Sequence, residues 1–311
     1  MAADEGVFGA LIGQPLVVDT LQQAVVDAAR QPPGPAMTHA WLFTGPPGSG
    51  RSTAAICFAS ALACSSGGCG ICAECRQVPT GAHPDVEVVR PEGLSYSVHE
   101  ARALVQRAAM APMSAPWHVV VLEDADRLTE EAANVLLKTL EEPSPRTVWL
   151  LCAPSVEDVM PTVRSRTRHV GLRTPSGAEV AEALMVRDQI DPAMAAFAAR
   201  ASQGHIGRAR ALARDEHARI RRQEVLRIPL ELRDLPSCFV NAANLLAAAT
   251  EDAEAATQPR EAAEAEAVRT EFGSASGEAP LRGAVRRSMD AALKDLQRRQ
   301  RTRATRTVRD Q

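Results

Sequence analysis

Residues 39–64 carry the sequence HAWLFTGPPGSGRSTAAICFASALAC, which predicts a strand, a glycine-rich turn and a helix in immediate succession. The apolar run at 40–43 is a short strand, and an alanine-rich helix begins near Gly50. The turn fits the pattern G-x-x-x-x-G-K-[ST] except at the lysine, where Arg51 stands. A strand before and a helix after the turn are the context that a phosphate-binding loop requires. The segment therefore predicts such a loop.

The candidate phosphate ligands are the loop's glycines, hydroxyls and cation. The glycines let backbone N–H groups point at phosphate oxygens, and the following helix adds its N-terminal dipole. A bound ATP or ADP with Mg²⁺ is the expected cofactor. Fast hydrolysis is not expected, because a guanidinium is larger and more planar than the lysine ammonium that this pattern normally carries. The predicted nucleotide-binding residues of the loop are Gly45, Gly48, Ser49, Gly50, Arg51 and Ser52.

The rest of the first half alternates strands with helices. Strands are expected at 86–89, 119–122 and 148–152, separated by helices at 98–110 and 130–141. Near-continuous apolar strands in this alternation predict an α/β fold with a parallel sheet covered on both faces.

The strand at 119–122 ends in Glu123 and Asp124. Carboxylates at this position hold Mg²⁺ and orient the attacking water in proteins with a phosphate-binding loop. The order here is glutamate before aspartate, the reverse of the usual one, which shifts each carboxylate by about one methylene group. Both residues are predicted to lie at the nucleotide site, and their order again predicts slow hydrolysis.

Four of the seven cysteines fall within the twelve residues 64–75. Their thiolates can surround a zinc ion tetrahedrally and leave no open position for catalysis, so a structural Zn²⁺ is expected. An iron–sulfur cluster and a set of free buried cysteines stay open as alternatives. The predicted metal ligands are Cys64, Cys69, Cys72 and Cys75.

Beyond about residue 172 only helical patterns remain. Helices are expected at 176–186, 191–201, 207–222 and 223–249, followed by an acidic stretch at 251–280 that is predicted to be a mobile linker or a loosely held helix. These patterns predict a nucleotide-binding domain over 1–172, a small helical domain over 173–222 and a helical region over 223–311.

Charge and hydropathy limit the classes of function. The formal net charge is −3, so the whole molecule is not a general polyanion binder, although residues 298–309 form a basic patch. That patch is better interpreted as the exposed face of a helix than as a DNA site. No apolar run can span a bilayer and the acidic N-terminus lacks a signal-peptide core, so a cytoplasmic protein is expected.

With these motifs in order, the chain resembles the clamp-loader branch of the AAA+ ATPases, from about residue 7 to about residue 215. The segment 8–14 (FGALIGQ) is similar to the box that lies beside the adenine in this family. The cysteine module directly after the loop helix is typical of its gamma/tau and delta-prime branches, and His83-Pro84-Asp85 is typical of delta-prime. The run 134–143 (NVLLKTLEEP) is nearly a signature of bacterial loaders. The resemblance implies an AAA+ domain, a helical lid and a helical collar.

The resemblance also implies roles for two arginines. In Ser165-Arg166-Thr167, Arg166 stands where the family carries an arginine finger that enters a neighbouring subunit's ATP site. Arg164 and Arg168 are close enough in sequence to confuse this assignment. Arg208 matches the second sensor of the lid, whereas no residue is assigned as the first sensor.

The function implied is that of a delta-prime type subunit. It would be a largely stationary part of a DNA polymerase III holoenzyme, making no phosphodiester bonds itself and hydrolysing little ATP. Its expected partners are gamma/tau and delta subunits, the sliding clamp and, through the assembled complex, primed DNA. The alternatives are an active gamma/tau-type ATPase and a zinc-dependent scaffold that binds no nucleotide.

Overall fold

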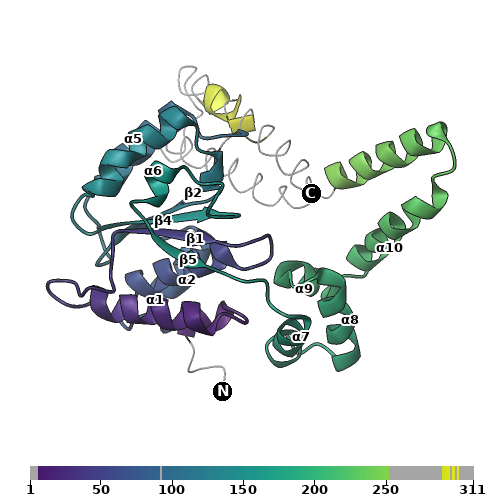
Figure 1. Ribbon diagram of the computed structural model, residues 1–311, viewed down its shortest axis with the longest axis horizontal. Helices are drawn as coiled ribbons and strands as arrows, with labels where there is room; N and C mark the ends of the chain where they lie inside the picture. The colour runs from purple at the N-terminus through teal and green to yellow at the C-terminus, as the bar shows by residue number, and fades with distance from the viewer. Residues whose placement is uncertain (1–5, 92, 252–288, 295, 298–299, 301–311) are drawn as a thin grey trace, which may run out of the picture. The chain divides into compact units, whose positions relative to one another are not determined.

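The computed structural model describes residues 6–91, 93–251, 289–294, 296–297 and 300 (Figure 1). Its centre is a sheet of five parallel strands in the order β2-β3-β4-β1-β5. The predicted parallel α/β sheet is confirmed, and a fifth strand is added that the sequence patterns did not predict. The strands are β1 (Ala40–Thr44), β2 (Val86–Val89), β3 (His118–Leu122), β4 (Thr147–Ala153) and β5 (Arg168–Gly171).

Helices cover both faces of this sheet. Side chains alternate along β1, so Trp41 and Phe43 pack on one face while Ala40 and Leu42 pack on the other. β1, β3 and β4 are buried along their whole length, which is the reason for their continuous apolar sequences. The first face is covered by α1 (Pro15–Ala28) and α2 (Arg51–Ala63), and the second by α4 (Val98–Ala108) and α5 (Glu130–Glu141).

Short polar signals set the helix boundaries. Ser97 caps α4 in a capping box with Glu100, and Thr129 caps α5 by accepting a hydrogen bond from the Ala132 N–H at 3.2 Å. α5 ends at Glu141, two residues before Pro143, as the sequence predicts. Capping therefore fixes where the two helices of the second face begin.

Three helices follow the sheet and form a small lid with its own apolar core. They are α7 (Gly177–Val186), α8 (Pro192–Ser202) and α9 (Ile206–Arg214). Val180, Leu184 and Leu212 pack between them together with several alanines. The helix expected at 207–222 is divided at Asp215, where the backbone is extended and α10 (Glu216–Glu231) begins.

Chain contacts divide the molecule at residue 219. Residues up to 219, apart from a short segment at 92–94, form one compact unit that contains both the sheet and the lid. The second unit holds α10 from Ile220 onward and a further helix at 235–251, and α10 has no buried residue. The acidic stretch 251–280 lies outside the described residues beyond its first position, and so does most of the basic segment from 281 onward. No helix in the described part of the chain is both long and apolar enough to cross a membrane.

Asp85 directly precedes the edge strand β2 and connects it to the loop that leads into β3. This carboxylate is 2% exposed and accepts hydrogen bonds from the backbone N–H groups of Met113, Ser114 and Ala115 at 2.6–2.7 Å. The Ser114 hydroxyl donates a fourth bond at 2.8 Å. Burial alone would raise the pKa of Asp85, but these donors outweigh it and lower the pKa from 3.8 to about 2. Asp85 thereby fixes the loop that leads into β3.

Candidate nucleotide site and metal centre

The loop at 45–50 joins β1 to α2 as the sequence predicts. Gly48 and Gly50 both have φ of +88°, in the left-handed region where a side chain would be strained. The Gly45 N–H donates to the carbonyl of Pro154 at 3.1 Å, which holds the start of the loop against the end of β4. The sequence thus forms the turn that a phosphate-binding loop needs.

A cavity of about 450 Å³ opens above this loop, which is within the usual size range of small-ligand sites. One part of its wall is the polar loop, and another part is the aliphatic segment 10–12, which belongs to the stretch that the family resemblance places beside the adenine. The lid closes a third side. The lining residues are Ala10, Leu11, Ile12, Pro47, Gly48, Ser49, Gly50, Arg51, Ser52, Thr53, His205, Ile206, Gly207 and Arg210.

Arg51 lies in the cavity wall with its guanidinium turned back on the loop. Its Nη1 donates to the Gly45 carbonyl at 2.8 Å. Its buried Nε makes no hydrogen bond to any residue that the structure describes. The guanidinium therefore supplies positive charge to the cavity from a position that its own loop restrains.

Ser52 and Glu123 come together below the loop. The Ser52 hydroxyl donates to the Glu123 carboxylate at 2.6 Å, and Glu123 is 5% exposed. The Tyr96 hydroxyl donates to the Glu123 backbone carbonyl at 2.6 Å and fixes this end of β3. A hydroxyl and a carboxylate side by side are oxygen ligands of the kind that Mg²⁺ prefers, so the pair fits a nucleotide-bound Mg²⁺. That ion would neutralise phosphate charge while Ser52 and Glu123 hold it.

Asp124 has a different position from its neighbour. Its backbone is left-handed, with φ of 51°, and it begins the short turn that follows β3. It is not among the residues that line the cavity. Glu123 does not line the cavity either, but the hydrogen bond from Ser52 connects its carboxylate to a residue that follows the loop glycines.

The lid presents His205 rather than Arg208 to the loop. A Cβ added to Gly48 would lie 2.8 Å from the His205 Cα, so the lid and loop backbones are in direct contact. The His205 ring accepts a hydrogen bond from the Arg208 N–H and caps α9. Burial, and then the nearby charge of Arg208, lowers the pKa of His205. Arg208 itself is exposed and does not line the cavity.

Arg210 is the lid arginine that reaches the cavity. Its Nε donates to Asp188 at 2.8 Å, and this ion pair holds it against the lid. Sequence reasoning missed both His205 and Arg210 as lining residues. No local sequence pattern marks these two residues, because their place in the cavity wall depends on the packing of α9 against the loop.

Arg166 lies at the opposite end of the sheet from its own phosphate-binding loop. β1 and β5 are parallel, with Trp41 paired to Arg168 and Thr44 paired to Gly171. The loop follows Thr44, whereas Arg166 comes two residues before β5 begins. Arg166 is also absent from the cavity wall. The side chain therefore cannot act on a nucleotide in its own chain.

The neighbours of Arg166 distinguish it from the adjacent arginines. Arg166 Nε donates to Glu141 at 2.6 Å, and its side chain is 31% exposed. Arg168 instead donates to the Ala36 carbonyl at 2.6 Å and lies over the Trp41 ring, 4.9 Å from its centroid. Arg168 is thus committed to packing, whereas Arg166 is held only by surface contacts on its own loop and Glu141.

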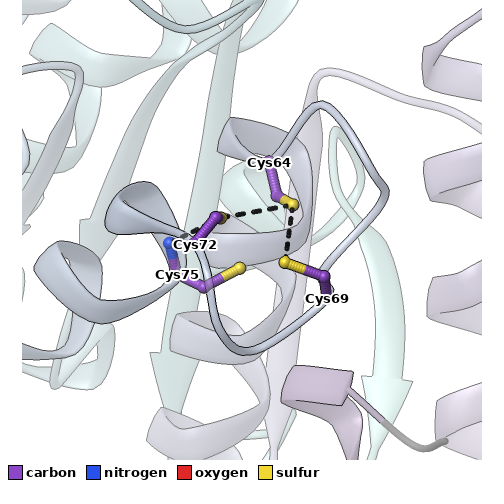
Figure 2. A group of neighbouring side chains, drawn as sticks. All are labelled: Cys64, Cys69, Cys72 and Cys75. Carbon is purple, nitrogen blue, oxygen red and sulfur yellow. Dashed lines mark hydrogen bonds between the residues drawn. The ribbon is translucent and has the colours of Figure 1, made fainter.

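The four predicted cysteine ligands form a cluster between α2 and α3 (Ala73–Thr80), as Figure 2 shows. The four sulfurs all lie within 4.8 Å of one another, and Cys64 is 3.7 Å from Cys69 and 3.6 Å from Cys72. Four thiolates at tetrahedral Zn–S bonds would lie about 3.8 Å apart, so the geometry fits Zn²⁺. Burial opposes ionisation of Cys64, but backbone N–H groups of Cys69, Gly68 and Ser66 outweigh it and lower its pKa to about 6. Backbone N–H groups of Ile71 and Cys72 likewise lower the pKa of Cys69. Burial raises the pKa of Cys75, and the pKa of Cys72 is raised to about 11, because burial and the Glu74 side chain outweigh the Cys75 N–H. The spacing of the four sulfurs is thus the feature that suits the cluster to bind one metal ion.

The family relationship follows from a comparison with known proteins. A family model described as DNA polymerase III, delta subunit, matches residues 21–176, which is half of the chain. The chain belongs to this family. As a member of the DNA polymerase III delta subunit family, it has the AAA+ P-loop fold that the resemblance implies.

Relatives of two subunit types match this member of the DNA polymerase III delta subunit family. The DNA polymerase III subunit delta′ of Bacillus subtilis is 29% identical over 195 residues, covering 62% of this chain and 59% of the relative. The DNA polymerase III subunit gamma/tau of Mycobacterium tuberculosis is 33% identical over 171 residues, covering 53% of this chain and 28% of the relative. A DNA polymerase III gamma subunit-related protein of Thermotoga maritima is 16% identical, with a TM-score of 0.43 over 75% of this chain and 72% of that chain. The resemblance inferred from the sequence is confirmed, and the chain spans less than two thirds of these two curated relatives.

The cysteine cluster gives a prediction about metal content. We expect the purified chain to contain about one zinc ion, because four thiolates complete a structural zinc site. Elemental analysis by mass spectrometry measures this, with Cys69→Ser expected to lose most of the metal. Cys238→Ser is the matched control, since Cys238 is exposed and lies outside the cluster. Iron with visible absorption would indicate an iron–sulfur cluster instead, and a metal-free chain would indicate free cysteines.

Proposed function

We propose that this chain is the delta-prime type subunit of a replicative clamp loader, which completes a neighbouring subunit's ATP site with Arg166. In this role it assembles with gamma/tau and delta subunits and helps to load the sliding clamp onto primed DNA. The observation that carries the proposal is the position of Arg166 at the far end of β5 from its own loop. An arginine in this position is too far from its own loop, so the proposed role requires a nucleotide bound to another chain.

The cavity supports a site that binds nucleotide and hydrolyses it slowly. Its loop, the Ser52–Glu123 pair and its aliphatic wall suit ATP or ADP with Mg²⁺. The cation of the loop, however, is a guanidinium held by the Gly45 carbonyl, and neither Glu123 nor Asp124 lines the cavity. Phosphoryl transfer depends on close placement of cations and of the attacking water. A subunit that binds nucleotide without rapid turnover fits these features.

Reconstitution tests this function. A loader assembled from gamma/tau, delta and this chain is expected to hydrolyse ATP in the presence of clamp and primed DNA. The same mixture without this chain, and this chain alone, are each expected to be at least about 100-fold slower. Equal rates with and without the chain would contradict the proposal. Absence of any heat on titrating the chain with ATP or ADP would favour the scaffold alternative.

Variants at Arg51 test whether this chain is a delta-prime type subunit or an active gamma/tau-type ATPase. In the assembled loader, Arg51→Ala is expected to leave ATP hydrolysis within about twofold of the original, because the proposed turnover occurs in other chains. Arg51→Lys is the companion variant, and it is expected to raise the slow hydrolysis by the isolated chain. A large loss of complex activity in Arg51→Ala would mean that this chain's own site turns over.

A further inference from the structure

The helix that starts at the nucleotide cavity ends at the cysteine cluster. α2 begins at Arg51 in the cavity wall, and its C-cap is Cys64, the first of the four predicted ligands. Its 13 residues span about 20 Å and are mostly buried against the sheet. The polar wall of the cavity and the cysteine cluster are thus the two ends of one packed helix.

A second connection runs through the 3₁₀ helix η1 (Gly6–Ala10). The Val7 N–H donates to the Gly68 carbonyl at 2.9 Å, and Gly68 precedes the ligand Cys69. The Val7 carbonyl accepts a hydrogen bond from the Cys57 thiol of α2 at 3.1 Å. Both backbone groups of Val7 are therefore held, one by the cysteine loop and one by α2. η1 then continues directly into the aliphatic cavity wall at 10–12.

The contact between η1 and the cysteine loop is close. Gly68 has φ of +101°, and a Cβ there would lie 2.8 Å from the Val7 side chain and 3.0 Å from Ala61. A Cβ on Gly6 would meet the Gly68 carbonyl oxygen. Two glycines thus allow the two backbones to approach. Since Ser65, Ser66, Gly70 and Ile71 of this loop are exposed, the loop has little apolar core of its own and depends on the cysteines for its shape.

We infer that the cysteine loop positions the aliphatic wall of the nucleotide cavity, with Gly68 as the positioning residue. A metal bound by the four cysteines would fix the loop and, with it, the Gly68 carbonyl. That carbonyl accepts the hydrogen bond from the Val7 N–H, and Val7 in turn positions residues 10–12. Loss of the metal, or of the close Gly68–Val7 contact, loosens this wall while the phosphate-binding loop keeps its own support from β1 and β4. The inference rests on the proposed nucleotide binding, and it assigns the zinc module a role in binding the base.

Because the aliphatic wall and the phosphate-binding loop are supported separately, the experiment compares a ligand that contacts both with one that contacts only the loop. Calorimetry on the full chain compares ADP, which has a base, with inorganic tripolyphosphate, which has none. Removing zinc with a chelator is expected to weaken ADP binding about tenfold or more and to leave tripolyphosphate binding within about twofold. Gly68→Ala is expected to do the same while it keeps its zinc. Gly81→Ala is the matched control, because Gly81 also has positive φ, at +72°, but a Cβ there would touch nothing within 4 Å.

Hydrogen exchange supplies a measurement that does not require nucleotide. On zinc removal the Val7 amide is expected to lose protection, because its acceptor is the Gly68 carbonyl, whereas amides within β4 keep theirs. Unchanged ADP affinity in the zinc-free chain, or unchanged Val7 protection, would overturn the inference. Equal weakening of ADP and tripolyphosphate would also overturn it, since that result indicates general unfolding. If the zinc-loaded chain bound neither compound, the proposed nucleotide site itself would be lost.

Discussion

Replacing Arg166 with alanine is expected to slow ATP hydrolysis in the assembled loader about 10³-fold at the one site that, under the proposed function, this arginine completes. A trans arginine neutralises the charge that develops on the transferred phosphoryl group, so its loss affects the rate more than the affinity. The measurement uses a loader whose other ATP sites are inactivated at their own phosphate-binding loops. Hydrolysis stimulated by DNA and clamp then reports on the remaining site alone.

Two further variants make the Arg166 result specific. Arg164→Ala removes an exposed cation at the end of α6 (Pro161–Arg164), two residues before Arg166, and is expected to leave the rate within about twofold. Arg166→Lys keeps the charge but loses the fork of donors, so an intermediate rate is expected. Each complex is first shown to assemble by co-elution. An unchanged rate in an intact Arg166→Ala complex would mean that Arg166 completes no active site, and the gamma-like and scaffold alternatives would return.

The ion pair with Glu141 does not prevent Arg166 from reaching another chain. Both side chains are partly exposed, at 31% and 49%, and exposed ion pairs contribute only about 0–1 kcal/mol. The arginine can therefore leave Glu141 at little cost when a phosphate is within reach. Glu141→Gln is accordingly expected to retain the activity of the loader.

Asp85→Ala is expected to lower the free energy of unfolding by about 3–5 kcal/mol, because four hydrogen-bond donors in a buried site lose their acceptor. Chemical denaturation followed by circular dichroism measures this change. Ser114→Ala is the matched control, since it removes only one of the four bonds and is expected to cost about 1 kcal/mol. A loss for Asp85→Ala no larger than that for Ser114→Ala would show that the carboxylate does not hold the loop.

The pKa of Asp85 gives this prediction a pH dependence. The folded-state pKa is about 2 and the ordinary value is 3.8, so the charged form stabilises the folded chain. That contribution is fully present above about pH 4 and is lost as the pH falls toward 2. The stability difference between the original chain and Asp85→Asn should therefore shrink over this interval. Taking the difference cancels the loss of zinc in acid, which both chains share.

The sequence predicted the buried parts of this fold better than its edges. β1, β3 and β4 are apolar throughout because both faces of the sheet are covered, and all three were expected near their observed positions. β5 was missed because it is a four-residue edge strand in which only Val170 is buried. A strand of this kind has no periodic apolar pattern, and its place is set by pairing with β1.

The candidate site shows the same division. The loop and the four cysteines were predicted because their chemistry depends on residues close together in sequence. The lid was harder, since Arg208 follows a family motif while the observed contact is made by His205. Only the packing of α9 on Gly48 determines which side chain of that helix turn faces the cavity. Residues 48 and 205 lie far apart in the sequence, so no local pattern predicts that they are in contact.

The pairing of β1 with β5 has a consequence for symmetry. The nucleotide cavity follows β1 and the partly exposed Arg166 precedes β5, so the proposed acceptor and donor of the trans arginine lie at opposite poles of the sheet. Association through such a pair is heterologous, because the two chains use different surfaces, and a twofold dimer cannot satisfy it. Repeated head-to-tail contacts of this kind form a ring or an open spiral with a direction. Under the proposed function, a chain that keeps its donor pole while its acceptor pole turns over slowly belongs at the end of such an arrangement.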